Sequence, residues 1–155
     1  MVKTKGRIRL CIILLCCNLA FIWGNSLLPA EYSRALSSFV KNVLSFIFPA
    51  SGPEDSGGEG HHLLRKLAHF AEFACLGMLL TWLTQMLRTT KWEYYVFPLL
   101  AGAMVACLDE IVQIFVPGRG PGILDVGIDT LGVILGIVLI NGYVCIKCKI
   151  WRKIK

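Results

Sequence analysis

The sequence predicts an all-α integral membrane protein with four transmembrane helices and both termini on the cytoplasmic side. The 155 residues are 55% hydrophobic with a mean hydropathy of +0.65, which leaves too little polar surface to cover a water-soluble core. Four apolar segments are each long enough to cross the ~30 Å hydrocarbon layer of a bilayer as a helix. Lysine and arginine are concentrated in the segments expected on one side of the membrane.

The four predicted spans cover about residues 10–28, 67–87, 94–116 and 123–145, and residues 1–155 form a single domain. The first span follows a basic segment as a signal peptide does, but no small-residue cleavage site follows, which favours an uncleaved helix. Residues 29–66 form the predicted external loop. Within it, apolar residues between Ser33 and Phe48 recur at helical spacing, which predicts a short interfacial helix between spans one and two.

The orientation follows from the distribution of basic residues. With the N-terminus in the cytoplasm, eleven of the 16 lysines and arginines lie on the cytoplasmic side and five on the outer side. This asymmetry predicts that both termini are cytoplasmic and that the turn between spans three and four faces outward. Because the basic residues lie beside apolar spans, the predicted partners are membrane lipids with anionic headgroups rather than nucleic acid.

Polar and charged residues interrupt the outer ends of the last three spans. Each ionisable group at a helix centre costs about 2.5–3.5 kcal/mol, so several of them near one turn indicate a functional site; the alternative is that they only pair and fix helix packing. At ~1.5 Å rise per residue, the acids of these spans reach a common depth of about 8–10 Å. The predicted ligand-binding residues are Lys66, His69, Glu72, Asp109, Glu110, Gln113, Arg119, Asp125 and Asp129.

The charge of this group is unbalanced. Its five acids face two bases, Lys66 and Arg119, a net charge of −3 if every group is ionised. Like charges in a low dielectric do not all stay ionised, so either some carboxyl groups share protons or a cation binds. The sequence requires no cofactor, but a divalent cation such as Mg²⁺ or Ca²⁺, which prefer oxygen ligands, remains an alternative. One histidine without a cysteine pair argues against structural zinc.

Arg119 lies in a Pro-Gly-Arg-Gly-Pro-Gly turn over residues 117–122. Glycines on either side allow a ligand to approach the backbone. Two orientations of the guanidinium are open: inward to Asp125 or Glu110, or outward to a phosphate, whose oxygens its planar fork matches.

Other side chains of the predicted pocket have two alternative roles each. His69 is either an acid/base group or ligand, or a packed, hydrogen-bonded histidine. Asn25 and Ser26 either extend the pocket from the first span or cap its end, and we interpret them as caps. The candidates for catalytic residues are His69, Glu72, Asp109 and Glu110.

Several of these residues form motifs that occur together in a known family. The motifs are K-x-x-H at Lys66 and His69, D-E-x-x-Q from Asp109 to Gln113, P-x-R ending at Arg119, and then Asp125, Gly132 and Gly136. With them, nearly the whole chain resembles the VanZ-like family of small bacterial membrane proteins. The resemblance implies a multi-pass protein of the bacterial plasma membrane with a role in resistance to glycopeptide antibiotics (teicoplanin).

Two functions are compatible with these residues, and whether the protein is an enzyme stays open. In the first, an outward-facing polar pocket binds an envelope lipid or a cell-wall ligand, because Lys66 and Arg119 at its rim suit phosphate. In the second, an intramembrane enzyme acts on a lipid or polyprenyl-phosphate headgroup, with His69 and the carboxylates as acid and base. A small ion-coupled carrier is a further alternative. It has less support, because the chain has four spans and no visible internal repeat.

Overall fold

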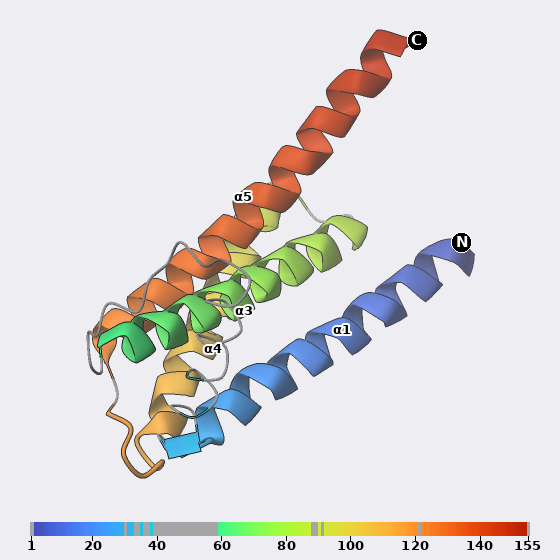
Figure 1. Ribbon diagram of the computed structural model, residues 1–155. Coiled ribbons are helices and arrows are strands. Elements are labelled where there is room, and N and C mark those ends of the chain that lie inside the picture. The colour runs from blue at the N-terminus through green and yellow to red at the C-terminus, as the bar shows by residue number, and fades with distance from the viewer. Residues whose placement is uncertain are drawn as a thin grey trace.

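The computed structural model describes residues 2–29, 31–32, 35, 38, 59–87, 90, 92–120 and 122–154. These residues form four long helices and no strand, as Figure 1 shows. The helices are α1 (Val2–Leu27), α3 (Glu59–Met86), α4 (Glu93–Gln113) and α5 (Ile123–Ile154). Each contains a segment long and apolar enough to cross a membrane. The prediction of an all-α protein with four spans is therefore confirmed, and the chain is a multi-pass membrane protein.

Two helices are longer than their predicted spans. α3 begins at Glu59, inside the predicted external loop, and α5 continues to Ile154 instead of ending at 145. The predicted ends were placed where charged residues begin, but lysine, arginine and leucine are good helix formers. A helix therefore continues past the apolar segment into the polar layer. At ~1.5 Å per residue, the 32 residues of α5 extend over about 48 Å, more than the hydrocarbon layer requires.

α4 ends at Gln113, earlier than the predicted 116. The next three residues continue in tighter i→i+3 hydrogen bonds, from the N–H of Ile114 to the carbonyl of Ile111 and likewise for the two residues that follow. Such tighter winding of the last turn is a common way to satisfy backbone carbonyls that have no i→i+4 partner at the end of a helix. Gly118 then adopts a positive φ of 77°, which only glycine accepts without strain, and the chain reverses toward α5.

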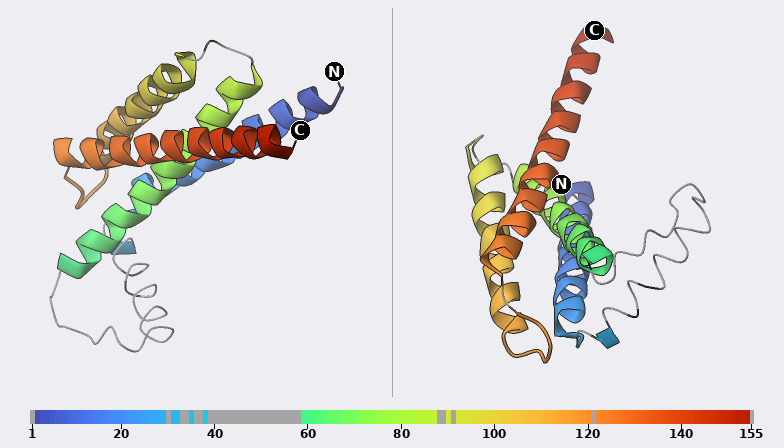
Figure 2. Two further views of the ribbon diagram at one scale, coloured as in Figure 1. Left: turned by 90° about the horizontal axis from the view of Figure 1, so that it is seen from above. Right: turned by 60° about the vertical axis from the view of Figure 1, so that its left-hand side comes forward.

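Both ends of the described chain lie at the same end of the bundle. In Figure 1 the beginning of α1 and the end of α5 point the same way, and Figure 2 shows the same arrangement from two other sides. An even number of spans requires this arrangement; that this side is cytoplasmic remains a prediction. The predicted interfacial helix over 33–48 lies outside the described residues except at two positions.

α3 and α5 pack in backbone contact because glycines line their interface. A Cβ at Gly77 would overlap the backbone of Val133, one at Gly132 the carbonyl of Phe70, and one at Gly136 the carbonyl of Ala74. The two helices therefore approach each other closely at Gly132 and Gly136. Small residues allow such contact between membrane helices, where packing replaces the hydrophobic effect as the driving force.

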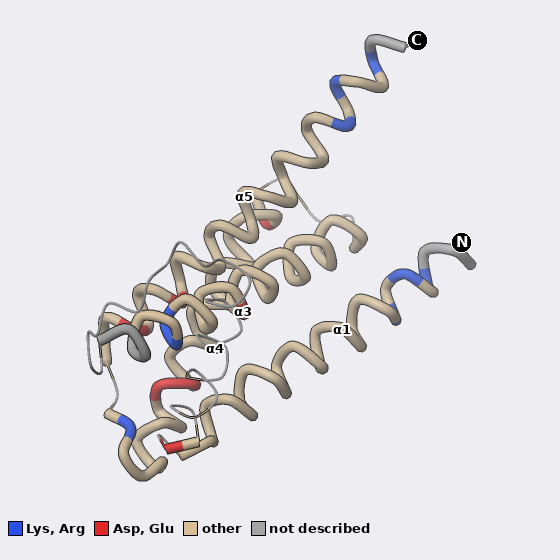
Figure 3. Tube along the Cα trace, viewed as in Figure 1, with Lys and Arg blue, Asp and Glu red and all other residues tan. Residues whose placement is uncertain are grey.

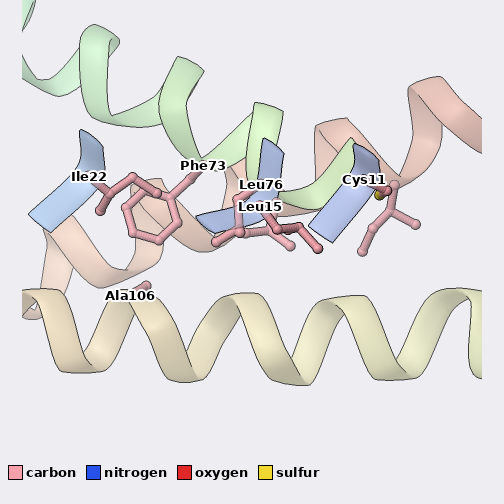
Figure 4. Packing of buried hydrophobic residues seen from close by; sticks show 8 residues of the cluster. Cys11, Leu15, Ile22, Phe73, Leu76 and Ala106 are labelled. Carbon is pink, nitrogen blue, oxygen red and sulfur yellow. The ribbon is translucent and has the colours of Figure 1, made fainter. Parts of the chain in front are cut away.

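The apolar core joins all four helices. Figure 4 shows Ile22 and Leu15 of α1 beside Phe73 and Leu76 of α3, with Ala106 of α4 facing them. Most other large apolar side chains face outward; Leu100 and Phe21, for example, are 65% and 59% exposed. Such a surface would be unusual in water and is appropriate for contact with lipid chains.

Candidate functional site

The acidic residues of the spans gather at one end of the bundle. Figure 3 shows lysines and arginines at the beginning of α1 and at the end of α5, while the opposite end, around the beginning of α5 and the end of α4, holds most of the acids together with a few basic residues. Three acids of this end are buried rather than lipid-facing: Asp109, Glu110 and Asp129 are 0%, 6% and 2% exposed. Polar groups inside and apolar groups outside are what a membrane environment favours.

Asp109 of α4 is the centre of a buried hydrogen-bonded group. Its Oδ2 accepts hydrogen bonds from Ser26 Oγ at 2.7 Å and from Gln113 Nε2 at 2.8 Å. Gln113 Nε2 also lies 3.2 Å from Ser26 Oγ. Gln113 is one turn after Asp109 on the same helix face, whereas Ser26 comes from α1. The other carboxylate oxygen, Oδ1, is buried and has no hydrogen-bond partner among the described residues.

A second polar contact joins α1 to α3. Asn25 Nδ2 donates a hydrogen bond of 2.7 Å to Glu72 Oε1. His69 lies one turn before Glu72, and its Nδ1 is 3.9 Å from Glu72 Oε2, too far for a hydrogen bond. Both of these atoms are buried and unpaired in the part of the chain that the structure describes.

α5 contributes two aspartates on one face. Asp125, at the first turn, forms an ion pair of 2.8 Å with Lys66 of α3 at the partly exposed rim. Asp129 lies one turn deeper. Ligand-type atoms of His69, Asp109 and Asp129, each from a different helix, lie within 4.8 Å of one another.

The turn after α4 brings Arg119 to the end of α1. Its Nη2 donates a hydrogen bond of 2.7 Å to the backbone carbonyl of Asn25, while its Nε and Nη1 are buried without a described partner. Burial, together with the positive charge of Arg65, lowers the pKa of Arg119 from its ordinary value. A guanidinium still stays protonated at neutral pH, so its unpaired N–H donors carry positive charge and suit an anion.

A small cavity opens beside these residues. Its volume is about 20 Å³, and its lining comprises Arg65, Lys66, His69, Gln113, Asp125, Ile128 and Asp129. A single water needs about 10–15 Å³ measured in this way. The cavity therefore holds one water-sized guest or one ion, and a lipid headgroup does not fit inside it.

The structure brings together most of the predicted residues, with two differences. Glu110 turns away toward the loop, where its Oε2 accepts a 2.9 Å hydrogen bond from the backbone N–H of Gly122. Arg119 makes no described ion pair with Asp125 or Glu110, because its described partner is the Asn25 carbonyl; its binding of a phosphate stays a prediction. The spacing of acids predicts which helix faces are polar, but it does not predict which neighbour each side chain contacts.

The interpretation of Asn25 and Ser26 as caps was wrong. α1 continues to Leu27, and both side chains cross to acids on neighbouring helices instead of bonding to their own backbone. Their position in the sequence could have predicted these contacts. Two hydrogen-bonding residues at the outer end of the first span lie level with the acids of the other spans.

Comparison with known protein families identifies the family of the chain. A family model described as VanZ/LLP1 matches residues 11–146. The chain belongs to the VanZ/LLP1 family. The VanZ/LLP1 match covers most of each of the four spans and every residue of the buried polar group, so this group lies wholly within the family domain. No curated protein and no solved structure matches the chain.

Proposed function

We propose that this VanZ-type membrane protein acts in the bacterial plasma membrane and contributes to resistance to glycopeptides such as teicoplanin. It does so by binding the anionic headgroup of an envelope lipid, or of a lipid-linked cell-wall precursor, at the outward mouth of the polar pocket. The family membership supports the process, and the residues at the mouth support the ligand class.

Arg119 is the observation on which this proposal depends. Its guanidinium is held at one nitrogen by the Asn25 carbonyl, and two further nitrogens have no described hydrogen-bond acceptor. Buried donors of this kind are costly unless something accepts from them. A phosphate or carboxylate supplies two oxygens in the geometry that the guanidinium fork presents.

The surroundings of Arg119 favour an anion over a cation at this position. Arg65 and Lys66 lie at the rim of the neighbouring cavity, and Lys66 already pairs with Asp125. Because the cavity holds only a water-sized guest, the headgroup stays at the mouth, between the basic residues, and its acyl or prenyl chain remains among the lipids.

The test compares Arg119→Lys and Arg119→Ala with the wild-type protein. Lysine keeps the positive charge but lacks the planar fork. We expect Arg119→Lys to insert and fold normally, to bind phosphate-bearing lipids in nanodiscs at least about tenfold more weakly, and to lose the glycopeptide phenotype. Thermal stability in detergent, lipid binding and antibiotic susceptibility are the three measurements. Full binding and full phenotype in Arg119→Lys would make Arg119 a structural counter-ion and contradict the proposal.

A second candidate function is an intramembrane enzyme that acts on a lipid or polyprenyl-phosphate headgroup. One observation favours it: His69 lines the cavity next to buried carboxylates and below a basic mouth, an arrangement that suits general acid–base chemistry. Incubation of purified protein with polyprenyl phosphate and diphosphate lipids distinguishes the two. A product absent with His69→Gln would favour the enzyme, and unchanged lipids would favour binding alone.

A further inference from the structure

Three side chains from three helices converge in a group that the anion site does not use, and two of them, His69 and Asp129, also line the cavity. His69 of α3, Asp109 of α4 and Asp129 of α5 each place a ligand-type atom within 4.8 Å of the other two. Asp109 and Asp129 are 0% and 2% exposed. A protein can position such a set only by packing three helices tightly, as the glycines of α3 and α5 allow here.

Two of these three residues have a buried polar atom without a described hydrogen bond. Asp109 is fully buried, and its Oδ2 is occupied by Ser26 and Gln113. Its Oδ1 is left without a described hydrogen bond, as is Nδ1 of His69. Metal-binding carboxylates are commonly held in this way, with outer hydrogen bonds that orient the ligand and leave one oxygen for the metal.

Charge supports a cation at the same place. Within the described residues, no lysine or arginine forms an ion pair with Asp109 or Asp129; Lys66 pairs with Asp125 and Arg119 binds a carbonyl. Two carboxylates in a low dielectric repel each other unless one is protonated or a cation lies between them. The adjoining cavity of about 20 Å³ accommodates an ion or a water.

We propose that His69, Asp109 and Asp129 bind one divalent first-row transition-metal ion. The imidazole favours Zn²⁺ or Mn²⁺ over Ca²⁺, which takes only oxygen ligands. Three protein ligands leave a coordination position open toward the cavity, as in sites where a metal binds water or substrate rather than holding a fold together. Ser26 and Gln113 are positioning residues, which orient Asp109 without touching the ion.

The test measures metal binding directly, so it does not depend on the lipid or on the antibiotic phenotype. Metal-free protein in detergent is titrated with Zn²⁺ by calorimetry and with Mn²⁺ by electron paramagnetic resonance. Cys145→Ser and Cys148→Ser are present in every sample, because these exposed free thiols bind zinc on their own. We expect one ion per chain, and binding of Zn²⁺ and Mn²⁺ at least about tenfold tighter than binding of Mg²⁺.

The variants separate the ligands from their neighbours. His69→Gln, Asp109→Asn and Asp129→Asn should each weaken binding by more than about a hundredfold, and Ser26→Ala, which removes an outer hydrogen bond, by about 10–100-fold. Glu93→Gln is the control, an exposed acid at the beginning of α4, far along that helix from Asp109, and should leave the affinity unchanged. If Asp109→Asn does not fold, Asp129→Asn carries the test, since it loses no described hydrogen bond.

Three results would overturn the proposal: no binding by the wild-type chain, equal binding of Mg²⁺, or equal loss in Glu93→Gln and the ligand variants. Circular dichroism and gel filtration confirm that each variant is folded before it is titrated.

Discussion

Asp109 and Asp129 lie close together, yet their environments differ. Asp109 accepts two hydrogen bonds through Oδ2, from Ser26 and Gln113. Asp129 is almost as deeply buried but has no described hydrogen-bond donor that would stabilise a negative charge. In the absence of a cation, its burial beside other acids therefore opposes folding.

This difference predicts that Asp129→Asn stabilises the metal-free protein. The amide removes one like charge at almost constant volume, and a gain of about 1 kcal/mol would raise the Tm by about 2–4 °C for a chain of this size. Thermal unfolding in detergent with chelator present is the measurement. The same variant should bind metal poorly, so stability and ion affinity change in opposite directions.

Asp125→Asn is the control for this prediction. It also removes an acid from the pocket face of α5, but this acid is half-buried and forms a partly exposed ion pair with Lys66, which the substitution breaks. Pairs of this exposure contribute about 0–1 kcal/mol, so its Tm should stay constant or fall slightly. A lower Tm for Asp129→Asn than for Asp125→Asn would show that the Asp129 carboxylate is stabilised in the metal-free protein.

At the level of the helices, the contact between α3 and α5 fixes the distance across the pocket. Lys66, His69 and Glu72 lie on α3, whereas Asp125 and Asp129 lie on α5. Gly132 and Gly136 follow Asp129 along α5 and rest on the α3 backbone. A wider separation of the two helices would move His69 away from Asp129 and lengthen the ion pair at the rim.

Two glycines of α5 test this relation. At Gly136 a Cβ would overlap backbone atoms of Ala74 and Met78, whereas at Gly142 it would meet nothing within 4 Å. We expect Gly136→Ala to destabilise the protein by about 1–3 kcal/mol through overpacking and to weaken Zn²⁺ binding. Gly142→Ala, the matched control, should be neutral or stabilising by up to about 1 kcal/mol, since alanine is the better helix former. Equal effects of the two substitutions on Tm and on metal affinity would contradict a structural role for the interface.

The helices could be predicted from the sequence more fully than the site. Within lipid the backbone must satisfy its own hydrogen bonds, so a long apolar segment such as 123–145 has to be a helix. The ends at Glu59 and Ile154 lie outside the apolar segments, where this constraint no longer applies. Depth along each span placed Glu72, Asp109 and Asp129 at one level.

The rotation of each helix about its own axis, and the helices that it packs against, could not be predicted from the sequence. A lipid-facing side and a core-facing side are both apolar, so the pattern of α1 does not reveal which face meets α3 and α4. The contacts of Asn25 with Glu72 and of Ser26 with Asp109 join residues far apart in sequence. Nothing local marks such partners, and for this reason the amide and the hydroxyl were interpreted as caps.

For the molecule as a whole, the orientation in the membrane is the main open prediction. The structure places both termini at one end of the bundle (Figure 1) and the Arg119 turn near the other. The excess of basic residues at the termini predicts that their end is cytoplasmic. The pocket then opens outward, toward the cell wall.

Single cysteines test this orientation in a chain whose seven native cysteines have been replaced by serine or alanine. A membrane-impermeant thiol reagent applied to intact cells should label Gly120→Cys, which lies in open space. It should label Lys149→Cys only after the cells are lysed. Labelling of Lys149→Cys alone in intact cells would invert the topology and place the pocket on the cytoplasmic side.

The long-range contacts of α1 have a consequence for how the protein is made. Ser26 and Asp109 are separated by 83 positions, and Asn25 and Arg119 by 94. At about 5–20 residues per second of synthesis, the first helix waits roughly 4–19 s before the ribosome delivers its partners. During that time its polar end holds an amide and a hydroxyl, which are neutral, whereas a charged side chain at a helix centre would cost about 2.5–3.5 kcal/mol on insertion. The carboxylates come on helices that emerge later, when a donor is already in place to receive them.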